Sequence, residues 1–188
     1  MDEINTHKKA LIHVLHMAYS GELAAGYAYN AHWRSLKDPE QRLGIQKIEN
    51  EEWAHREIVG KMLTFLGDGP QKPRELMMAI IGRTVGLACF VIGSFLPMYF
   101  AGRLESANIK EYENAAFHAS KLALHDFAAE LIRLANVERE HEHFFLTMVN
   151  GHWLLPAMKT IFKWGTIVDF KASGNGRSVG AAPTDSIP

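Results

Sequence analysis

Two short segments of the chain each place a glutamate and a histidine three residues apart, Glu52-Trp-Ala-His55 and Glu138-Arg-Glu-His141. On a helix, residues three apart project from the same face, so each segment presents a carboxylate and an imidazole together. A further glutamate precedes each segment at a similar distance, Glu22 before the first and Glu105 before the second. The spacing predicts four helices that bring four carboxylates and two imidazoles to one place, which is a ligand set for two metal ions.

One Glu-x-x-His segment on a charged helix is more often a solvated face than a metal site. The register of the neighbouring residues decides between these two interpretations. Around the second segment, a buried face with alternating spacings of three and four is predicted. It consists of Leu131, Leu134, Glu138, His141, Phe145 and Met148. The competing pair, Glu140 and His143, falls in line with Arg133 and Asn136 and is interpreted as solvated.

The other three glutamates also continue apolar stripes. Glu52 and His55 follow Ile45 and Ile48, and the neighbouring Glu51 lacks the three-residue relation to His55. Four carboxylates on apolar faces would be very costly unless they were paired or bound to metal. The predicted metal ligands are Glu22, Glu52, His55, Glu105, Glu138 and His141.

The predicted ligands contain no thiolate, which favours iron, with manganese as the alternative, over copper(I) or an iron–sulfur cluster. Two metals bridged by carboxylates suit redox chemistry with O2, although Lewis-acid hydrolysis stays open. Tyr112, two turns after Glu105, is a candidate catalytic residue that transfers a radical or supports the ligands, and the alternative is a plain core aromatic.

The composition is that of one globular domain. The chain has 188 residues, 47% of them hydrophobic and 22% charged, and a net charge of −1, which gives no nucleic-acid footprint. A single cysteine, Cys89, excludes an internal disulfide and a multi-thiolate metal site. The first residues lack the apolar core of a signal peptide, which favours a cytoplasmic location.

Helical periodicity without any strand pattern predicts an all-α fold. We expect helices at 8–35, from Pro39 to about 66, from before Glu105 to near 122, and at 125–149, with an extra C-terminal helix at 153–171. Residues 71–102 are predicted to form a long apolar crossover that lets the second and third helices run parallel. The predicted domain spans 1–171, and 172–188 is predicted to be a disordered tail.

The crossover contains nineteen residues between Arg83 and Arg103 without a charge. This length reaches that of a membrane span, but Gly86, Gly93 and Pro97 interrupt it, so a helix that dips into one leaflet is preferred. The alternative is packing within the protein or in a homo-oligomer. Residues 153–170 are expected at the same membrane surface, which would admit a lipophilic substrate.

With these motifs in this order, the chain resembles the demethoxyubiquinone hydroxylase family over roughly residues 18–165. The resemblance implies a ferritin-like four-helix bundle that is peripheral on the inner face of the cell membrane. It also implies a di-iron monooxygenase that uses O2 and an external reductant to hydroxylate a benzoquinone carrying a polyprenyl tail. Carried over, the six predicted ligands hold two iron ions, and Glu52 and Glu138 bridge them.

The chain departs from that family at three positions. The family tends to have an acidic residue ahead of each Glu-x-x-His, where this chain has Asn50 and Asn136, and often a second glutamate where it has Ser106. The departures concern the surroundings of the ligands and the substrate.

Two other functions remain open. One is a soluble ferritin-like or rubrerythrin-like ferroxidase or peroxide-reducing protein, with the apolar run in a subunit interface. The other is a bundle without metal that uses the apolar run for assembly. A tRNA-modifying or fatty-acyl di-iron enzyme is a further possibility, but the charge balance argues against nucleic acid.

Overall fold

The computed structural model describes residues 2–165, and all regular elements in that range are α-helices. They are α1 (Asp2–Ser35), α2 (Pro39–Phe65), α3 (Lys72–Cys89), α4 (Phe95–Lys121), α5 (His125–Val149) and α6 (Leu155–Phe162). The predicted all-α class is confirmed. The predicted tail at 172–188 and the domain boundary at 171 lie outside the described residues.

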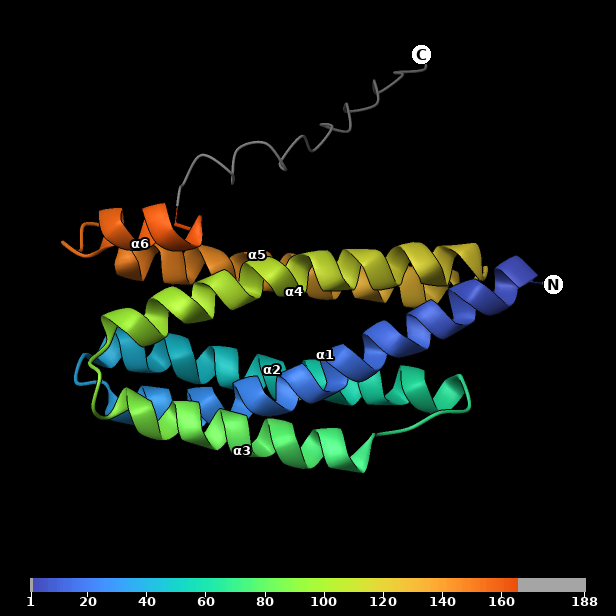
Figure 1. The fold of residues 1–188 in the computed structure, drawn as a ribbon, viewed down its shortest axis with the longest axis horizontal. Helices are drawn as coiled ribbons and strands as arrows, with labels where there is room; N and C mark the ends of the chain where they lie inside the picture. The colour runs from blue at the N-terminus through green and yellow to red at the C-terminus, as the bar shows by residue number, and fades with distance from the viewer. Residues whose placement is uncertain (1, 166–188) are drawn as a thin grey trace, which may run out of the picture.

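Four long helices, α1, α2, α4 and α5, surround the core (Figure 1). α1 and α5 run in one direction, and α2 and α4 run in the opposite direction (Figure 1). The two helices that follow and precede the crossover are therefore parallel, as the length of the connection predicted. This arrangement places the middle of each helix opposite the middles of the other three.

Apolar side chains of these four helices form two separate clusters along the bundle. One cluster includes Leu15, Val59, Ala115 and Leu131. The other includes Ile45, Tyr99, Phe145 and Val149. On α5 the first cluster ends at Ala135 and the second begins at Phe145, so Glu138 and His141 lie between them. The predicted ligands therefore sit in the middle of the bundle, with an apolar layer on each side.

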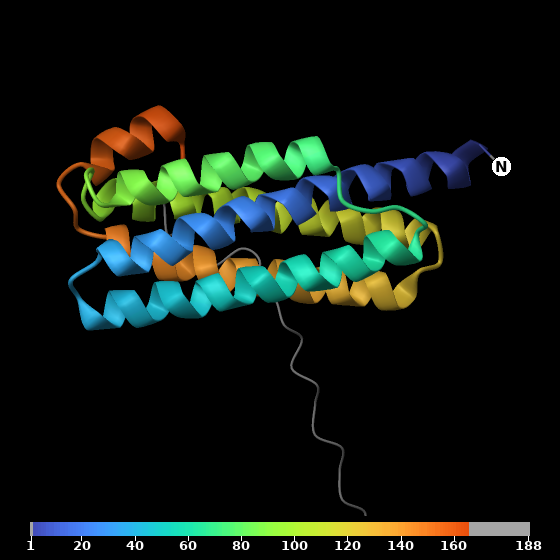
Figure 2. The ribbon, with the colours of Figure 1, turned by 90° about the horizontal axis from the view of Figure 1, so that it is seen from below.

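The predicted crossover at 71–102 is mostly helical, since it contains α3 and the first two turns of α4. Its buried positions in α3 are Ala79, Gly82, Gly86 and Cys89, a stripe of small residues at helical spacing. A Cβ at Gly82 would lie 2.3 Å from the carbonyl oxygen of Ala24, so only glycine lets α3 approach α1 this closely. Figure 2 shows α3 lying along the outside of α1.

α4 begins at Phe95, well before Glu105, although Pro97 was expected to interrupt the chain here. Pro97 is the third residue of the helix, where a backbone N–H has no partner within the helix in any case. The proline therefore stands in the first turn of α4 rather than ending a helix. As a result, a tight loop of a few residues joins α3 to α4.

The terminal helices also differ from the prediction. α1 begins at Asp2 rather than at residue 8, and its acidic first turn, with Asp2 and Glu3, suits a helix N-terminus. The expected helix 153–171 ends at Phe162, because Lys163 adopts a left-handed conformation with φ of 58°. The remainder of that prediction, 166–171, lies outside the described residues.

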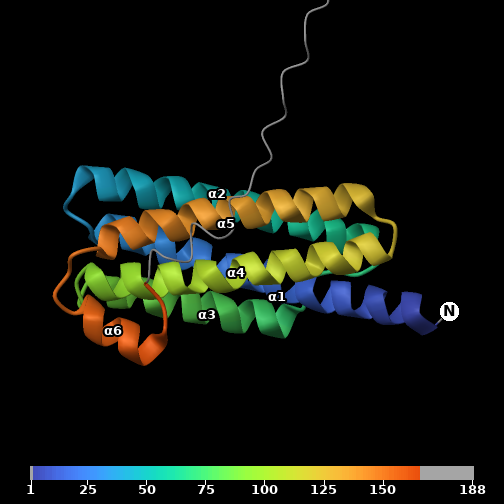
Figure 3. The same cartoon turned by 90° about the horizontal axis from the view of Figure 1, so that it is seen from above.

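α6 is fixed to the start of α4 at one end of the bundle (Figure 3). The hydroxyl of Tyr99 donates to the backbone oxygens of Met158 and Trp164, at 3.0 and 2.9 Å. The indole of Trp164 packs where Gly102 leaves room, and its N–H donates to Glu142 at 2.8 Å. Across residues 2–165, no helix combines the length and the hydropathy needed to cross a membrane.

Candidate metal centre

All six predicted ligand side chains meet in the middle of the bundle, and each is at most 3% exposed. They form two groups whose ligand atoms lie within 4.8 Å of one another. The first group is Glu22, Glu52, His55 and Glu138, and the second is Glu52, Glu105, Glu138 and His141. Glu52 and Glu138 belong to both groups. The structure thus offers two adjacent positions for a metal ion that share two carboxylates.

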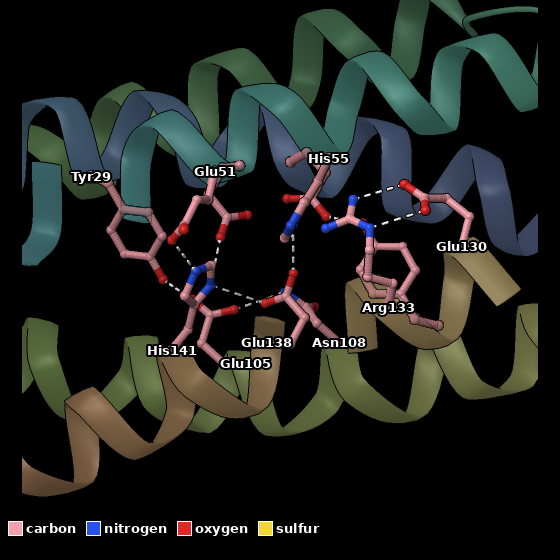
Figure 4. A network of polar contacts seen from close by, with 12 residues as sticks. Tyr29, Glu51, His55, Glu105, Asn108, Glu130, Arg133, Glu138 and His141 are labelled. Carbon is pink, nitrogen blue, oxygen red and sulfur yellow. Dashed lines mark hydrogen bonds and ion pairs between the residues drawn. The ribbon is translucent and has the colours of Figure 1, made fainter. Parts of the chain in front are cut away.

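Both imidazoles turn their Nδ1 atoms toward the shared carboxylates (Figure 4). His55 Nδ1 lies 2.9 Å from an oxygen of Glu138. His141 Nδ1 lies 3.2 Å from Glu52 Oε1 and 3.4 Å from Glu138 Oε2. Since neutral imidazole nitrogens and carboxylate oxygens are both metal donors, these atoms are oriented as ligands would be.

Most of the converging atoms lack a hydrogen bond, although they are close to one another. The buried atoms without a hydrogen-bond partner include Glu22 Oε2, both oxygens of Glu52 and of Glu138, and the Nδ1 atoms of His55 and His141. Buried polar atoms are nearly always hydrogen-bonded, and each exception costs free energy. A metal ion that accepts electron pairs from all of them would remove this cost. The donor set present therefore fits a pair of hard to intermediate divalent metals.

Two buried tyrosines make hydrogen bonds between α1 and α4 at the site. The Tyr112 hydroxyl on α4 donates to Glu22 Oε1 on α1, and the Tyr29 hydroxyl on α1 donates to Glu105 Oε1 on α4. Tyr112 was predicted as catalytic, and the structure places its hydroxyl on a predicted ligand. Tyr29 was missed as a site residue, although it follows Glu22 by seven positions, as Tyr112 follows Glu105.

Two further contacts orient the second group. Glu51 Oε2 lies 2.9 Å from Nε2 of His141, the ring nitrogen opposite the one that faces the carboxylates (Figure 4). Asn108 donates to Glu105 Oε2 at 3.0 Å. A carboxylate on the far nitrogen of a ligand histidine fixes its orientation and raises its basicity. Glu51 was not predicted as a site residue, because the spacing within one helix does not reveal its contact with His141 on α5.

Burial and crowding disturb the acidity of these groups. Burial raises the pKa of Glu52 well above its usual range, and the charges of Glu22 and Glu138 raise it further. Burial and Glu138 raise the pKa of Glu105 in the same way. Burial also opposes ionisation of Glu138, but contacts with His141 and His55 outweigh it and lower its pKa. Without metal, the cluster therefore retains protons that metal binding would displace.

The choice of register is supported by burial on α5. Glu138 and His141 are buried, whereas Glu140 and His143 are exposed. The structure brings together the six residues that the sequence selected, and their role as metal ligands stays a prediction. Comparison with protein-family models, with curated proteins and with solved structures finds no significant match for this chain.

We predict that Glu52→Gln makes the metal-free protein more stable. The substitution keeps the shape of the side chain but removes a carboxyl that is ionised in the unfolded chain and must take up a proton to be buried, so the free energy of unfolding should rise by about 1–3 kcal/mol at pH 8. Urea denaturation of protein stripped of metal measures this. Glu140→Gln, an exposed position on α5, is the control and should change stability by less than about 0.5 kcal/mol. A destabilised Glu52→Gln protein would show that the charge is compensated without metal.

The stability of the metal-free protein should also depend on pH, and the direction of the change follows from the raised pKa values of the buried glutamates. In the pH window above the ordinary glutamate range, carboxylates of the unfolded chain are ionised, whereas Glu52 and Glu105, whose pKa values are raised, hold their protons to higher pH in the folded state. The native state then binds more protons, so the stability of the metal-free protein should fall as the pH rises. The decline should be shallower in Glu52→Gln. Stability that rises over this window would contradict the assignment.

Proposed function

We propose that this protein is a di-iron monooxygenase that uses O2 to hydroxylate a lipophilic quinone or a related aromatic. The observation that carries the proposal is the pair of buried groups sharing Glu52 and Glu138, most of whose converging atoms have no hydrogen bond. Their composition, four carboxylates and two imidazoles, suits iron, with manganese as the alternative. The resemblance of the motif order to demethoxyubiquinone hydroxylases supports the choice of substrate.

Charge balance supports two metal ions rather than one. The four glutamates of the site carry four negative charges when ionised, and the two imidazoles are neutral when they act as ligands. Two divalent ions neutralise these charges, whereas a single ion would leave two negative charges in the apolar core. Burying uncompensated charge is strongly unfavourable.

The order of the helices supports a ferritin-like bundle. Helices α1 and α2 supply Glu22 and the first Glu-x-x-His, and α4 and α5 supply Glu105 and the second. A long connection through α3 separates the two helix pairs, as it does in bundles whose second and third core helices are parallel. Such bundles bind two metals through inward-facing glutamates and Glu-x-x-His pairs.

The residues around the ligands have defined roles in this proposal. Two iron ions, when bound, supply electrons and a place where dioxygen is reduced. Glu51 holds the ring of His141 in one orientation, and the hydroxyls of Tyr29 and Tyr112 hold Glu105 and Glu22. The apolar clusters on both sides exclude water, which strengthens these interactions and protects reactive species. Tyr112 also remains a candidate for radical transfer, because its hydroxyl touches a ligand.

A peripheral membrane contact is part of the proposal. The end of α3, the loop that follows it and α6 gather at one end of the bundle in all three views (Figures 1–3). The exposed apolar side chains there include Leu87, Phe90, Val91, Ile92, Trp153 and Ile161. Lys159 and Lys163 lie beside them in sequence, and basic residues next to apolar ones favour an anionic lipid surface.

We expect protein reconstituted anaerobically with Fe(II) to transfer an oxygen atom to a quinone. With a chemical reductant, 18O2 and a demethoxyquinone bearing a short isoprenoid tail, mass spectrometry should detect one 18O atom in the product. His141→Ala should reduce the rate at least about 100-fold, and Glu51→Gln about 10- to 100-fold, because Glu51 orients the ligand. Glu140→Gln serves as the control and should retain the rate.

Two outcomes would point to the rival functions. Rapid Fe(II) oxidation or peroxide reduction without label in the quinone would favour a ferroxidase or peroxide-reducing protein. Lack of any metal-dependent reaction would favour a bundle that serves in assembly.

We expect the apolar end to bind lipid. Co-sedimentation with vesicles that contain anionic phospholipid should decrease about tenfold in the double variant Val91→Asp and Ile92→Asp, since two charges replace exposed apolar groups. Ile4→Asp is the matched control, because Ile4 is 64% exposed near the N-terminus, at the opposite end of the bundle (Figure 1). Equal binding by both variants would contradict this surface as the membrane contact.

A further inference from the structure

A small cavity of about 30 Å³ lies between α1 and α4, directly beside the site. Its lining includes Met17, Gly21, Glu22, Asn108 and Glu111. Glu22 belongs to the first group of ligands, and Asn108 donates to Glu105 of the second group. The volume suffices for one or two water molecules or a single ion, but not for an aromatic substrate.

Gly21 lines this cavity, and no neighbouring atom requires a glycine at this position. A Cβ built at Gly21 meets no atom within 4 Å, whereas a Cβ at Gly82 would collide with the backbone of α1. Glycine in a helix interior costs about 1 kcal/mol relative to alanine. Close helix packing accounts for that cost at Gly82 but not at Gly21. A side chain at position 21 would instead narrow the cavity.

Two carboxylate oxygens at the cavity have no hydrogen-bond partner. Glu22, 3% exposed, leaves its Oε2 unpaired, and Glu111 leaves its buried Oε1 unpaired. Glu22 Oε1 is already held by Tyr112, so Oε2 is the oxygen that remains for another partner. Unpaired carboxylate oxygens attract cations, and the hard divalent metals prefer oxygen donors.

We propose that this cavity is the route by which divalent metal ions enter the site, with Glu111 receiving the ion from solvent and passing it to Glu22. The inference rests on the proposed metal centre and adds a path to it. Apolar layers close the bundle on both sides of the site, so an ion needs a path lined by oxygen atoms. Molecular oxygen, which carries no charge, would gain nothing from these carboxylates.

Stopped-flow uptake of Co(II) by the whole metal-free protein, followed by its visible absorbance, tests the route. Burial and the charge of Glu22 raise the pKa of Glu111 to about 7, so the experiment is done anaerobically at about pH 8, where the carboxylate is ionised. Glu111→Gln removes the charge and Gly21→Leu fills the space. Each should slow association about tenfold or more.

The dissociation rate of the metal, measured with excess chelator, distinguishes residues that line an entry route from residues that are metal ligands. Narrowing a path slows entry and exit by the same factor, so Gly21→Leu should leave the final stoichiometry and the Kd unchanged. Gly21→Ala should give a smaller effect in the same direction. Glu140→Gln, which removes a charge from the exposed face of α5, should not change the rates.

Three results would overturn the proposal. Unchanged uptake in both Glu111→Gln and Gly21→Leu would place the route elsewhere. A lower metal stoichiometry in Glu111→Gln would make Glu111 a ligand rather than a point of transit. Wild-type protein that takes up no Co(II) or Fe(II) at equilibrium would overturn the metal centre together with its entry route, whereas normal equilibrium binding with unchanged rates would overturn the route alone.

Discussion

Four carboxylates lie in the apolar middle of this bundle with only two imidazoles beside them, and the rest of the structure depends on how that charge is balanced. Glu22, Glu52, Glu105 and Glu138 are each at most 3% exposed. Within the part of the chain that the structure describes, the ion-pair partners of these carboxylates are His55 and His141 rather than a lysine or an arginine. Protonation relieves part of the repulsion in the absence of metal, at the cost of stability as the pH rises. Two divalent ions would relieve all of it. The apolar clusters on both sides give these interactions their strength, because they keep water away.

The helix pair α1 and α2 and the helix pair α4 and α5 contribute the same kinds of residues, and both pairs are needed to form the site. Helices α1 and α2 carry a glutamate, a tyrosine seven residues later and a Glu-x-x-His, and α4 and α5 repeat that order. Each tyrosine donates a hydrogen bond to the glutamate of the opposite half, and the two ligand groups share Glu52 and Glu138. Neither half therefore holds a complete site. The helix α3 allows this pairing because it returns the chain to the end at which α4 must begin in order to run parallel to α2 (Figure 1).

The sequence predicted the residues that meet through helical register, and it failed where contacts depend on neighbours in space. Glu138 and His141 were separated correctly from Glu140 and His143, because a helix face can be read from spacing. Glu51 was set aside, since its contact with His141 crosses from α2 to α5. Tyr29 could have been found from its seven-residue distance to Glu22, the same distance that drew attention to Tyr112.

A helix was expected within the crossover, but its packing against α1 was only the alternative prediction. Its buried face consists of small residues such as Gly82 and Gly86, which a search for large apolar residues overlooks. The end of α6 depends on the left-handed conformation of Lys163, which the sequence does not predict because lysine does not favour that conformation. At the crossover, the close approach of α3 to α1, rather than local periodicity, determines which residues are buried.

The metal content of the purified protein after anaerobic reconstitution with Fe(II) tests the central claim most directly. The account predicts about two irons per chain, with loss of both in Glu138→Ala, because Glu138 belongs to both ligand groups. His143→Ala, on the exposed side of the same helix, should retain both. A wild-type protein that binds no iron, or a Glu138→Ala protein that binds as much as wild type, would contradict the account.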